Sequence, residues 1–260
     1  MYPTFVGYCP IDFEAMEAMT LIVPIFNEEA NILRVWAQVD EYRKKSNLQI
    51  YTLFVDDGST DSSLDLIREV CREDPCYGYL SFFQNRGLSA AIKAGVDHAQ
   101  SRWVGYIDGD LQTSPLDLLK FETFLYFYDL VTGERRQRQD SYGKKLSSSF
   151  ANWFRNLFLK DGISDTGCPL KVFDREFFLK IPYFNGFHRF FPALTQIYGG
   201  TVKVIPVQHF PRVEGKSKFN AWNRMIQPLL DMLLVWRLKK RRIHYAVKES
   251  KVAQLALIHE

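Results

Sequence analysis

Short apolar runs that alternate with helical segments are the feature of this sequence that most constrains its fold. Four such runs lie in the first half of the chain, at Leu21–Val23, Ile50–Val55, Tyr77–Phe83 and Trp103–Ile107. The segments between them, at about 28–45, 61–74 and 88–99, have the patterning of helices. Strands that alternate with helices of this length predict βαβ units. The predicted class is therefore α/β, with a mainly parallel sheet flanked by helices.

The alternation weakens after about residue 127, where the element boundaries are harder to predict. Asp129–Thr132 and Val202–Val207 are each candidates for one more strand. Ser114-Pro115 places a proline at the first position of a predicted helix. We expect residues 1–19 to be an N-terminal extension, 20–218 to form the main domain, and 219–260 to form an amphipathic basic helix and a tail.

Composition excludes several classes of protein. The chain has 260 residues and a net charge of +3, which is too small to suggest a nucleic-acid partner. Its four cysteines show neither metal-ligand spacing nor a disulfide framework, which favours a reducing compartment. No signal peptide is apparent, and no stretch reaches the roughly 20 apolar residues that span a bilayer.

The segment Asp108-Gly109-Asp110 carries the strongest chemical signal. It directly follows the apolar run Trp103–Ile107, so its two carboxylates are expected at the carboxyl end of a buried strand. Open α/β sheets bind ligands at that edge. Carboxylate oxygens at this spacing suit a divalent cation that keeps positions free for water and phosphate. An acidic turn without a ligand is the alternative interpretation.

Two further motifs place polar groups at strand ends. Pro24-Ile25-Phe26-Asn27-Glu28-Glu29 follows the first predicted strand, and Val55-Asp56-Asp57-Gly58-Ser59-Thr60-Asp61 ends the second. Carboxylates there can accept hydrogen bonds from a nucleobase or a ribose. Alternatively, the same side chains cap the helices that follow.

The order of these motifs resembles a known family. Together with Asn85-Arg86-Gly87-Leu88-Ser89-Ala90-Ala91 and Asp108-Gly109-Asp110-Leu111-Gln112, they resemble the family-2 inverting glycosyltransferases of GT-A fold. The detail is most similar to the dolichol- and polyprenyl-phosphate sugar transferases. The resemblance covers about residues 20–220.

The resemblance implies a set of site residues. The positions that it assigns to the nucleotide-sugar are Pro24, Phe26, Glu28, Val55, Asp57, Asp108, Gly109, Gln112 and Arg135. Asp108 and Asp110 would hold Mg²⁺ or Mn²⁺. Many relatives have Tyr at the position of Phe26, so this chain lacks the hydroxyl that those relatives carry there.

Later segments add implied catalytic groups. Arg212-Val213-Glu214-Gly215-Lys216-Ser217-Lys218 matches a family loop whose Arg212 and Lys218 would cover the diphosphate. The alternative for this loop is a solvated basic surface. Asp165 lies where relatives place an acceptor-side carboxylate, although the match around it is partial and a turn Asp is the alternative. His209 could assist the loop or simply pack, and Cys168 is interpreted as packing.

Two candidate helices suggest a membrane surface. The segment 144–158 has one apolar face, and its Ser148 and Asn152 resemble a motif near the acceptor phosphate. The segment 219–242 is apolar, and a basic cluster closes it. In that segment we expect Trp222, Leu229, Leu233 and Trp236, with Arg237, Lys239, Lys240, Arg241 and Arg242, to contact anionic lipid. The alternative is that both helices pack on the sheet.

The resemblance implies an inverting glycosyltransferase that moves a sugar from a UDP- or GDP-sugar to a polyprenyl phosphate. The enzyme would act on the cytoplasmic face of a membrane, as a peripheral protein or as part of a membrane-spanning one. A transferase acting on a sugar hydroxyl is the main alternative. A nucleotidyltransferase and an inactive binding module fit the motifs less well, and a homo-oligomer is left open.

Overall fold

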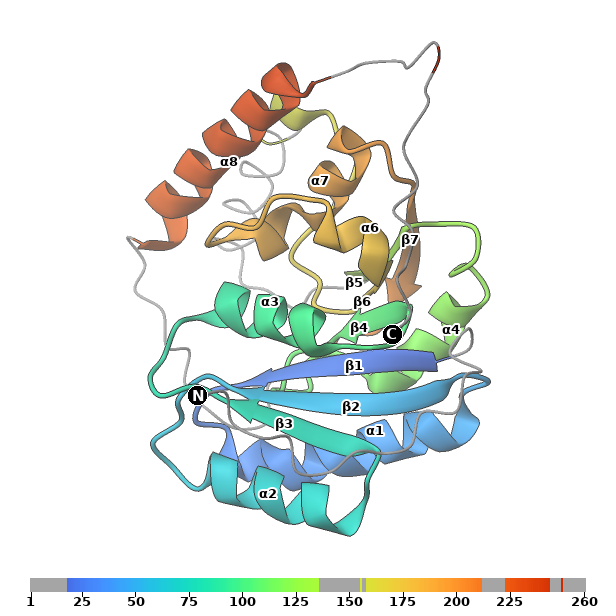
Figure 1. Ribbon diagram of the computed structural model, residues 1–260, viewed down its shortest axis with the longest axis vertical. Coiled ribbons are helices and arrows are strands. Elements are labelled where there is room, and N and C mark those ends of the chain that lie inside the picture. Colours follow the sequence, from blue (N-terminus) through green and yellow to red (C-terminus); the bar gives the residue numbers. More distant parts are fainter. Residues whose placement is uncertain (1–17, 136–154, 156–157, 212–222, 244–248, 250–260) are drawn as a thin grey trace, which may run out of the picture.

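A sheet of seven strands forms the centre of the protein, with helices on both of its faces (Figure 1). The computed structural model describes residues 18–135, 155, 158–211, 223–243 and 249. The strands follow the order β3-β2-β1-β4-β6-β5-β7 across the sheet. They are β1 (Ala18–Ile25), β2 (Gln49–Asp56), β3 (Tyr77–Ser81), β4 (Trp103–Tyr106), β5 (Leu130–Arg135), β6 (Lys171–Asp174) and β7 (Val202–Val207).

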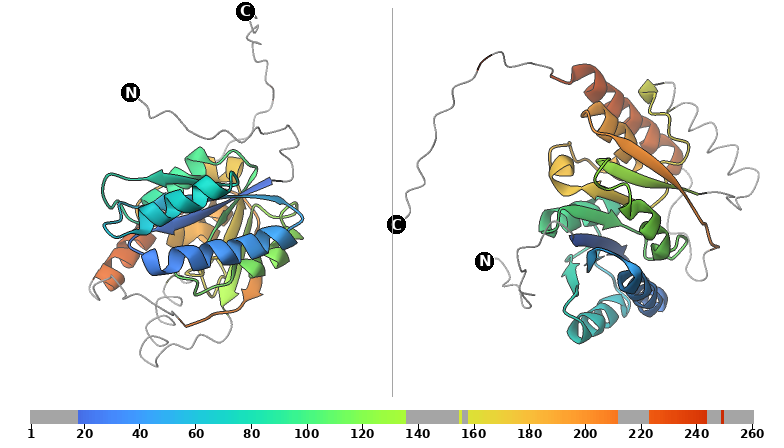
Figure 2. Two further views of the ribbon diagram at one scale, coloured as in Figure 1. Left: turned by 90° about the horizontal axis from the view of Figure 1, so that it is seen from below. Right: turned by 90° about the vertical axis from the view of Figure 1, so that its right-hand side faces the viewer.

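The helices cover the two faces of the sheet unequally (Figure 2). One face carries α1 (Ile32–Lys45), α2 (Ser63–Glu73) and α4 (Leu119–Glu122), with 3₁₀ turns at Glu29–Asn31 and Pro115–Leu118. The other face carries α3 (Leu88–His98), α6 (Arg175–Leu179), the 3₁₀ turn η4 (Phe187–Phe190), α7 (Phe191–Ile197) and α8 (Asn223–Arg241). Each layer buries its own apolar cluster against the sheet.

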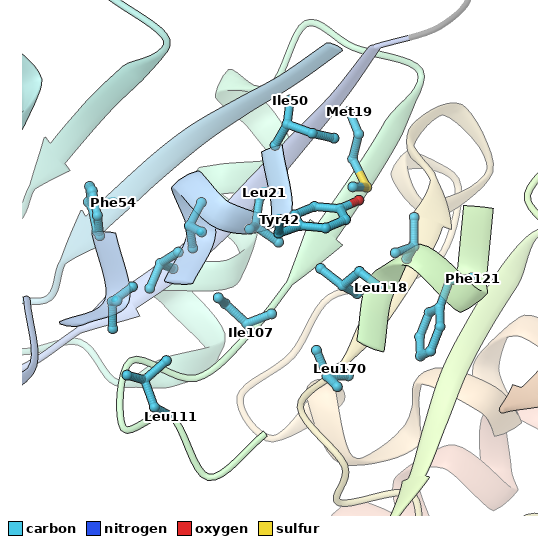
Figure 3. Packing of buried hydrophobic residues seen from close by; sticks show 14 of the residues in the cluster. Met19, Leu21, Tyr42, Ile50, Phe54, Ile107, Leu111, Leu118, Phe121 and Leu170 are labelled. Carbon is cyan, nitrogen blue, oxygen red and sulfur yellow. The ribbon is translucent and has the colours of Figure 1, made fainter. Parts of the chain in front are cut away.

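The core between the sheet and α1 packs large side chains from distant parts of the chain (Figure 3). Tyr42 of α1 is fully buried, and its hydroxyl donates to Glu122 at 2.9 Å. Met19 and Leu21 of β1 and Phe54 of β2 are also fully buried in this cluster. This packing fixes the first two strands, so the loops at their carboxyl ends start from rigid positions.

The predicted α/β class and the alternation in the first half are confirmed. The predicted helices at 28–45, 61–74 and 88–99 correspond to α1, α2 and α3. The side chain of Ser114 accepts a hydrogen bond from the backbone N–H of Leu116, so Ser114-Pro115 does begin a helical turn. Strand β1 starts at Ala18, two residues before the expected start of the domain.

Strand β6 is an element that the sequence analysis did not anticipate. It lies between β4 and β5 and runs antiparallel to both, with Lys171 opposite Tyr106 and Thr132. The other pairs of the sheet are parallel. Because β6 is reversed, its first residue and the loop before it lie at the edge where the parallel strands end.

Gly58, in the loop after β2, allows two segments of backbone to approach closely. Its φ is +70°, and an added Cβ would lie 2.6 Å from the carbonyl carbon of Gln84. Gly162 has the same φ of +70°, but a Cβ there would meet nothing within 4 Å. The two positions therefore share the left-handed backbone and differ in the space around it.

We predict that Gly58→Ala destabilises the fold more than Gly162→Ala does. Left-handed backbone alone should cost about 1–2 kcal/mol at either position. At Gly58 the clash with Gln84 should add roughly 1–3 kcal/mol. Denaturant unfolding of the two variants measures the difference directly, and equal losses would mean that the contact with Gln84 relaxes freely.

Candidate active site

The loops after β1 and β2 are joined by hydrogen bonds at the carboxyl edge of the sheet. The backbone N–H of Asn27 donates to Ser59 Oγ at 2.9 Å, and that of Glu28 donates to Ser63 Oγ at 2.9 Å. Asn27 Oδ1 accepts from the backbone N–H of Thr60 at 2.7 Å. Short polar side chains here join the two loops to each other, whereas Glu28 and Ser62, the N-cap residues of the helical turns that follow, make no side-chain cap hydrogen bond.

The predicted base-binding residues lie on β2 and just after it. Val55 is fully buried in the strand. Asp57 follows it, and its carboxylate accepts the backbone N–H groups of Arg86 at 2.6 Å and Gly87 at 2.8 Å. Burial raises the pKa of Asp57, although both hydrogen bonds act in the opposite direction. Asp57 therefore positions the Asn85-Arg86-Gly87 loop at the edge where a nucleoside is expected.

Gly109 brings the Asp108-Gly109-Asp110 turn against the end of β1. A Cβ on Gly109 would lie 2.6 Å from Cδ1 of Ile25 and 3.3 Å from the carbonyl oxygen of Pro24. Only glycine permits this approach without a shift of Ile25. The structure thus brings Pro24, Gly109 and both carboxylates together, with Phe26 and Glu28 half-buried in the loop that follows.

The two carboxylates of this turn have different surroundings. Asp108 Oδ1 accepts the hydroxyl of Tyr106 at 2.5 Å, whereas Asp110 Oδ1 accepts the backbone N–H of Gln112 at 3.1 Å. Burial, followed by the negative charge of Asp110, raises the pKa of Asp108 to about 6. Two nearby carboxylates that repel each other in a partly buried turn are a fitting site for a cation.

Within the described ranges, no three His, Cys, Asp or Glu side chains come together as a complete metal site. Asp108 and Asp110 supply carboxylate oxygens, which Mg²⁺ and Mn²⁺ accept as ligands. A cation held by so few protein groups depends on oxygens from water and substrate. That dependence suits an ion that binds together with a diphosphate.

Arg135 and Asp165 form a buried ion pair. Arg135 Nε donates to Asp165 Oδ2 at 2.8 Å, and Nη2 donates to Oδ1 at 2.9 Å. The backbone N–H of Arg135 also donates to Oδ2, at 3.1 Å. The side chains are only 12% and 7% exposed. Arg135, expected near the sugar phosphate, is therefore held as one unit with Asp165, expected on the acceptor side.

Lys171 is a buried cation that the sequence analysis missed. It is 1% exposed, and its ammonium group donates to the carbonyl oxygens of Thr166 and Cys168 in the loop that carries Asp165. Burial lowers the pKa of Lys171, while the charges of Asp165 and Asp108 oppose that shift. A lysine at the start of the otherwise apolar run Lys171-Val172-Phe173 was the signal that could have revealed it.

The backbone of Gln112 anchors the segment that leads to the predicted lid. Its carbonyl oxygen accepts the backbone N–H of Phe210 at 2.9 Å and lies 3.1 Å from His209 Nδ1. His209 therefore contacts the Asp108–Gln112 turn. Five residues with predicted roles lie outside the described residues, and those roles stay predictions: Ser148, Asn152, Arg212, Lys218 and Trp222.

Comparison with known proteins identifies the family. The model of glycosyl transferase family 2 matches residues 20–182. The chain belongs to this family. It is 32% identical over 239 residues to a dodecaprenyl-phosphate galacturonate synthase of Rhizobium johnstonii, covering 87% of this chain and 70% of that protein. It is 31% identical over 209 residues to the bactoprenol glucosyl transferase of Shigella phage SfV, covering 78% and 67%.

A solved structure supports the GT-A-like fold of this glycosyltransferase. Glucosyl-3-phosphoglycerate synthase from Mycobacterium tuberculosis superposes with a TM-score of 0.64 at 14% identity, over 86% of this chain and 80% of that one. That structure is a complex with Mn²⁺, UDP-glucose and phosphoglyceric acid. The predicted fold and the predicted family are therefore confirmed, and the chain is a glycosyltransferase.

We predict that Asp108→Asn stabilises the metal-free enzyme at neutral pH. The pKa of Asp108 is raised from 3.8 to about 6 in the folded state, so its ionisation penalises folding fully above about pH 6 and not at all below pH 3.8. Two pKa units correspond to nearly ~3 kcal/mol, which partial exposure reduces to about 1–2 kcal/mol.

Denaturant unfolding in EDTA at pH 8 and at pH 4 tests this. The gain should be present at pH 8 and should have nearly disappeared at pH 4. Asp65→Asn is the control, because Asp65 is 79% exposed on α2 and pairs only with Arg68 among the described ion pairs. A gain that is equal at both pH values would contradict the electrostatic explanation.

Proposed function

We propose that this family 2 enzyme transfers a sugar, with inversion, from a UDP- or GDP-sugar to a polyprenyl phosphate at a membrane surface. The names of the relatives support this acceptor, since they describe a dodecaprenyl-phosphate galacturonate synthase and a bactoprenol glucosyl transferase. The donor site is proposed at the loops after β1, β2 and β4, where Phe26, Glu28, Asp57 and Asp108 lie.

The ion pair of Asp165 is the observation that most favours a phosphate acceptor. Asp165 was the residue expected on the acceptor side, and its carboxylate accepts three hydrogen bonds from Arg135. A carboxylate bound in this way is a poor proton acceptor. A sugar hydroxyl would need a base to remove its proton, whereas a phosphate whose second pKa is about 6 is already largely ionised at neutral pH.

The proposed transfer needs no proton acceptor. An oxygen of the acceptor phosphate attacks the anomeric carbon, and the bond from that carbon to the donor diphosphate breaks. The nucleoside diphosphate leaves with the electron pair. Arg135 and Lys171 provide positive charge beside the reacting phosphates, and Arg212 and Lys218 are proposed to cover the leaving group. A divalent cation held by Asp108 and Asp110 would neutralise the diphosphate as it leaves.

A transferase acting on a sugar hydroxyl remains the second candidate. The position of His209 favours this second candidate, because His209 contacts Gln112 beside the carboxylate turn and is half-buried. In that case a histidine would serve as the base that removes the proton of the hydroxyl.

We predict glycolipid formation when the protein is given undecaprenyl phosphate, Mg²⁺ or Mn²⁺ and a panel of UDP- and GDP-sugars. Undecaprenol, which lacks the phosphate, is the matched control and should give no product. Asp110→Asn should lower kcat on the order of 10²-fold or more. Product from undecaprenol would contradict the need for an acceptor phosphate, and full activity of Asp110→Asn in EDTA would exclude the metal.

Helix α8 supports the membrane part of the proposal. Four leucines on one side of it are exposed: Leu229 by 40%, Leu230 by 54%, Leu233 by 43% and Leu234 by 42%. Its other side is buried on the protein through Asp231, Met232 and Val235. A leucine stripe of this kind, with Arg237 and Arg241 exposed beyond it, fits a helix lying in the lipid interface. The described residues include no helix with the length and apolarity to cross a bilayer.

Three expected lipid contacts are corrected by the packing of α8. Trp236 packs edge-on against Phe158, with ring centroids 6.2 Å apart, and so belongs to the protein side of the helix. Lys239 donates to the carbonyl oxygen of Leu159, and Arg242 donates to those of Ile197 and Tyr198. Both interpretations of this helix therefore hold in part, because it packs on the core with one face and exposes leucines on the other.

We predict that the leucine stripe holds the protein on vesicles that contain anionic lipid. The double substitution Leu230→Gln and Leu234→Gln should weaken partitioning by roughly 2 kcal/mol, or about 30-fold, because each half-exposed leucine loses about half of its transfer free energy. Leu33→Gln is the matched control, since Leu33 is 52% exposed on α1 at the opposite end of the molecule (Figure 1). Flotation assays measure the effect, and equal flotation of the wild type and the double variant would reject this surface.

A further inference from the structure

The turn from Phe184 to Phe191 connects α8 with the first turn of α3. Gly186 in this turn donates its backbone N–H to Ser89 Oγ at 2.8 Å. On the other side, Arg189 pairs with Asp231 of α8 at 3.4 Å. A Cβ on Gly186 would lie 2.3 Å from Asp231 Oδ2, so glycine is what lets α8 approach. The turn therefore lies between the helix with the exposed leucines and the loop that Asp57 holds.

His188 in this turn contacts the hydroxyl of Ser89 through one of its ring nitrogens. Its Nδ1 lies 2.9 Å from Ser89 Oγ, and the same oxygen already accepts the N–H of Gly186. The hydroxyl of Ser89 has no other acceptor within the described part of the chain, and we infer that it donates to Nδ1. When Nδ1 accepts, the proton of the neutral ring is on Nε2. No bond from Nε2 to another described residue is present.

The charges around His188 favour an anion at that position. Burial, followed by the positive charges of Arg189 and Lys171, lowers the pKa of His188 to about 3. The ring therefore stays neutral near pH 7 and can donate through Nε2–H only. It is half-buried, so it keeps some access to solvent although protein surrounds most of it. A neutral donor near a buried lysine suits a phosphate oxygen.

We propose that His188 binds a non-attacking phosphate oxygen of the acceptor through its Nε2–H, and that Ser89 is a positioning residue that fixes this tautomer. The inference rests on the proposed function. We infer that the ligand is the acceptor and not the donor because the turn is attached to α8, and a lipid phosphate would arrive from that helix. The predicted donor-site residues, Val55 on β2 and Asp57 just after it, lie on the far side of β1 from Lys171. No proton is transferred by His188 in this role.

The test compares two amides that replace different nitrogens of the ring. Gln in His188→Gln can place its NH₂ near the position of Nε2, whereas Asn in His188→Asn reaches only as far as Nδ1. His188→Asn should raise the KM for undecaprenyl phosphate by about tenfold or more, and His188→Gln by less than about threefold. The KM for the donor should change little in both. His98→Ala, at the other end of α3, is the control and should match the wild type.

Binding measured without turnover separates this inference from the proposed function. In ¹⁵N spectra, the wild type should show the Nε2–H tautomer of His188, and farnesyl phosphate should shift that signal. Ser89→Ala should lose the preference for this tautomer and weaken farnesyl phosphate binding. If farnesyl phosphate binds in this way but no glycolipid forms, the proposed function fails while the phosphate contact of His188 stands. An unchanged acceptor KM in His188→Asn, or an Nδ1–H tautomer in the wild type, would overturn the inference.

Discussion

Strand β6 runs antiparallel to both of its neighbours, β4 and β5, and the candidate site depends on that reversal. In a parallel sheet, each strand contributes the residues after its carboxyl end to the site. The reversed strand contributes the residues before it instead, so Asp165 and Lys171 reach the edge where Asp108 lies. Arg135, the last residue of β5, then pairs with Asp165 in the loop before β6. One antiparallel strand thus joins the predicted donor side and the predicted acceptor side.

The charges gathered at this edge reduce stability in the absence of substrate. Burial and Asp110 raise the pKa of Asp108 to about 6, and burial lowers the pKa of Lys171. Buried charges of this kind cost free energy unless they are paired. Arg135 and Asp165 pair with each other, but Asp108 and Asp110 repel each other. Groups arranged in this way are typical of sites that bind a charged ligand, because the ligand supplies the missing counter-charge.

The sequence predicted the first half of the fold well because local signals agree there. Apolar runs, helix periodicity and caps such as Ser114 all indicated the same elements, and β1 to β4 lie where they were expected. The sequence analysis missed strand β6 because this strand has only four residues and begins with a lysine. Its place between β4 and β5 is set by long-range pairing, which no local pattern encodes.

The candidate site could be predicted only where its residues follow strand ends. Pro24, Asp57, Asp108 and Asp110 come directly from such motifs, and the structure gathers them at one edge. The pairing of Arg135 with Asp165 joins residues that are 30 apart in sequence, so spacing could not indicate it. His188 was missed for the same reason, since its significance comes from Ser89, which is 99 residues away.

Helix α8 shows why patterning alone could not choose between packing and the membrane. Its middle, from Leu229 to Val235, is apolar on nearly every side except at Asp231. A helix that is apolar all round needs cover on all of its faces. The protein covers one face through Met232 and Val235, and Asp231 gains Arg189 and Gln227 as partners there. The remaining leucines form an apolar surface that is exposed to water. A lipid interface would cover this surface. The same helix would stay attached to the turn that carries His188.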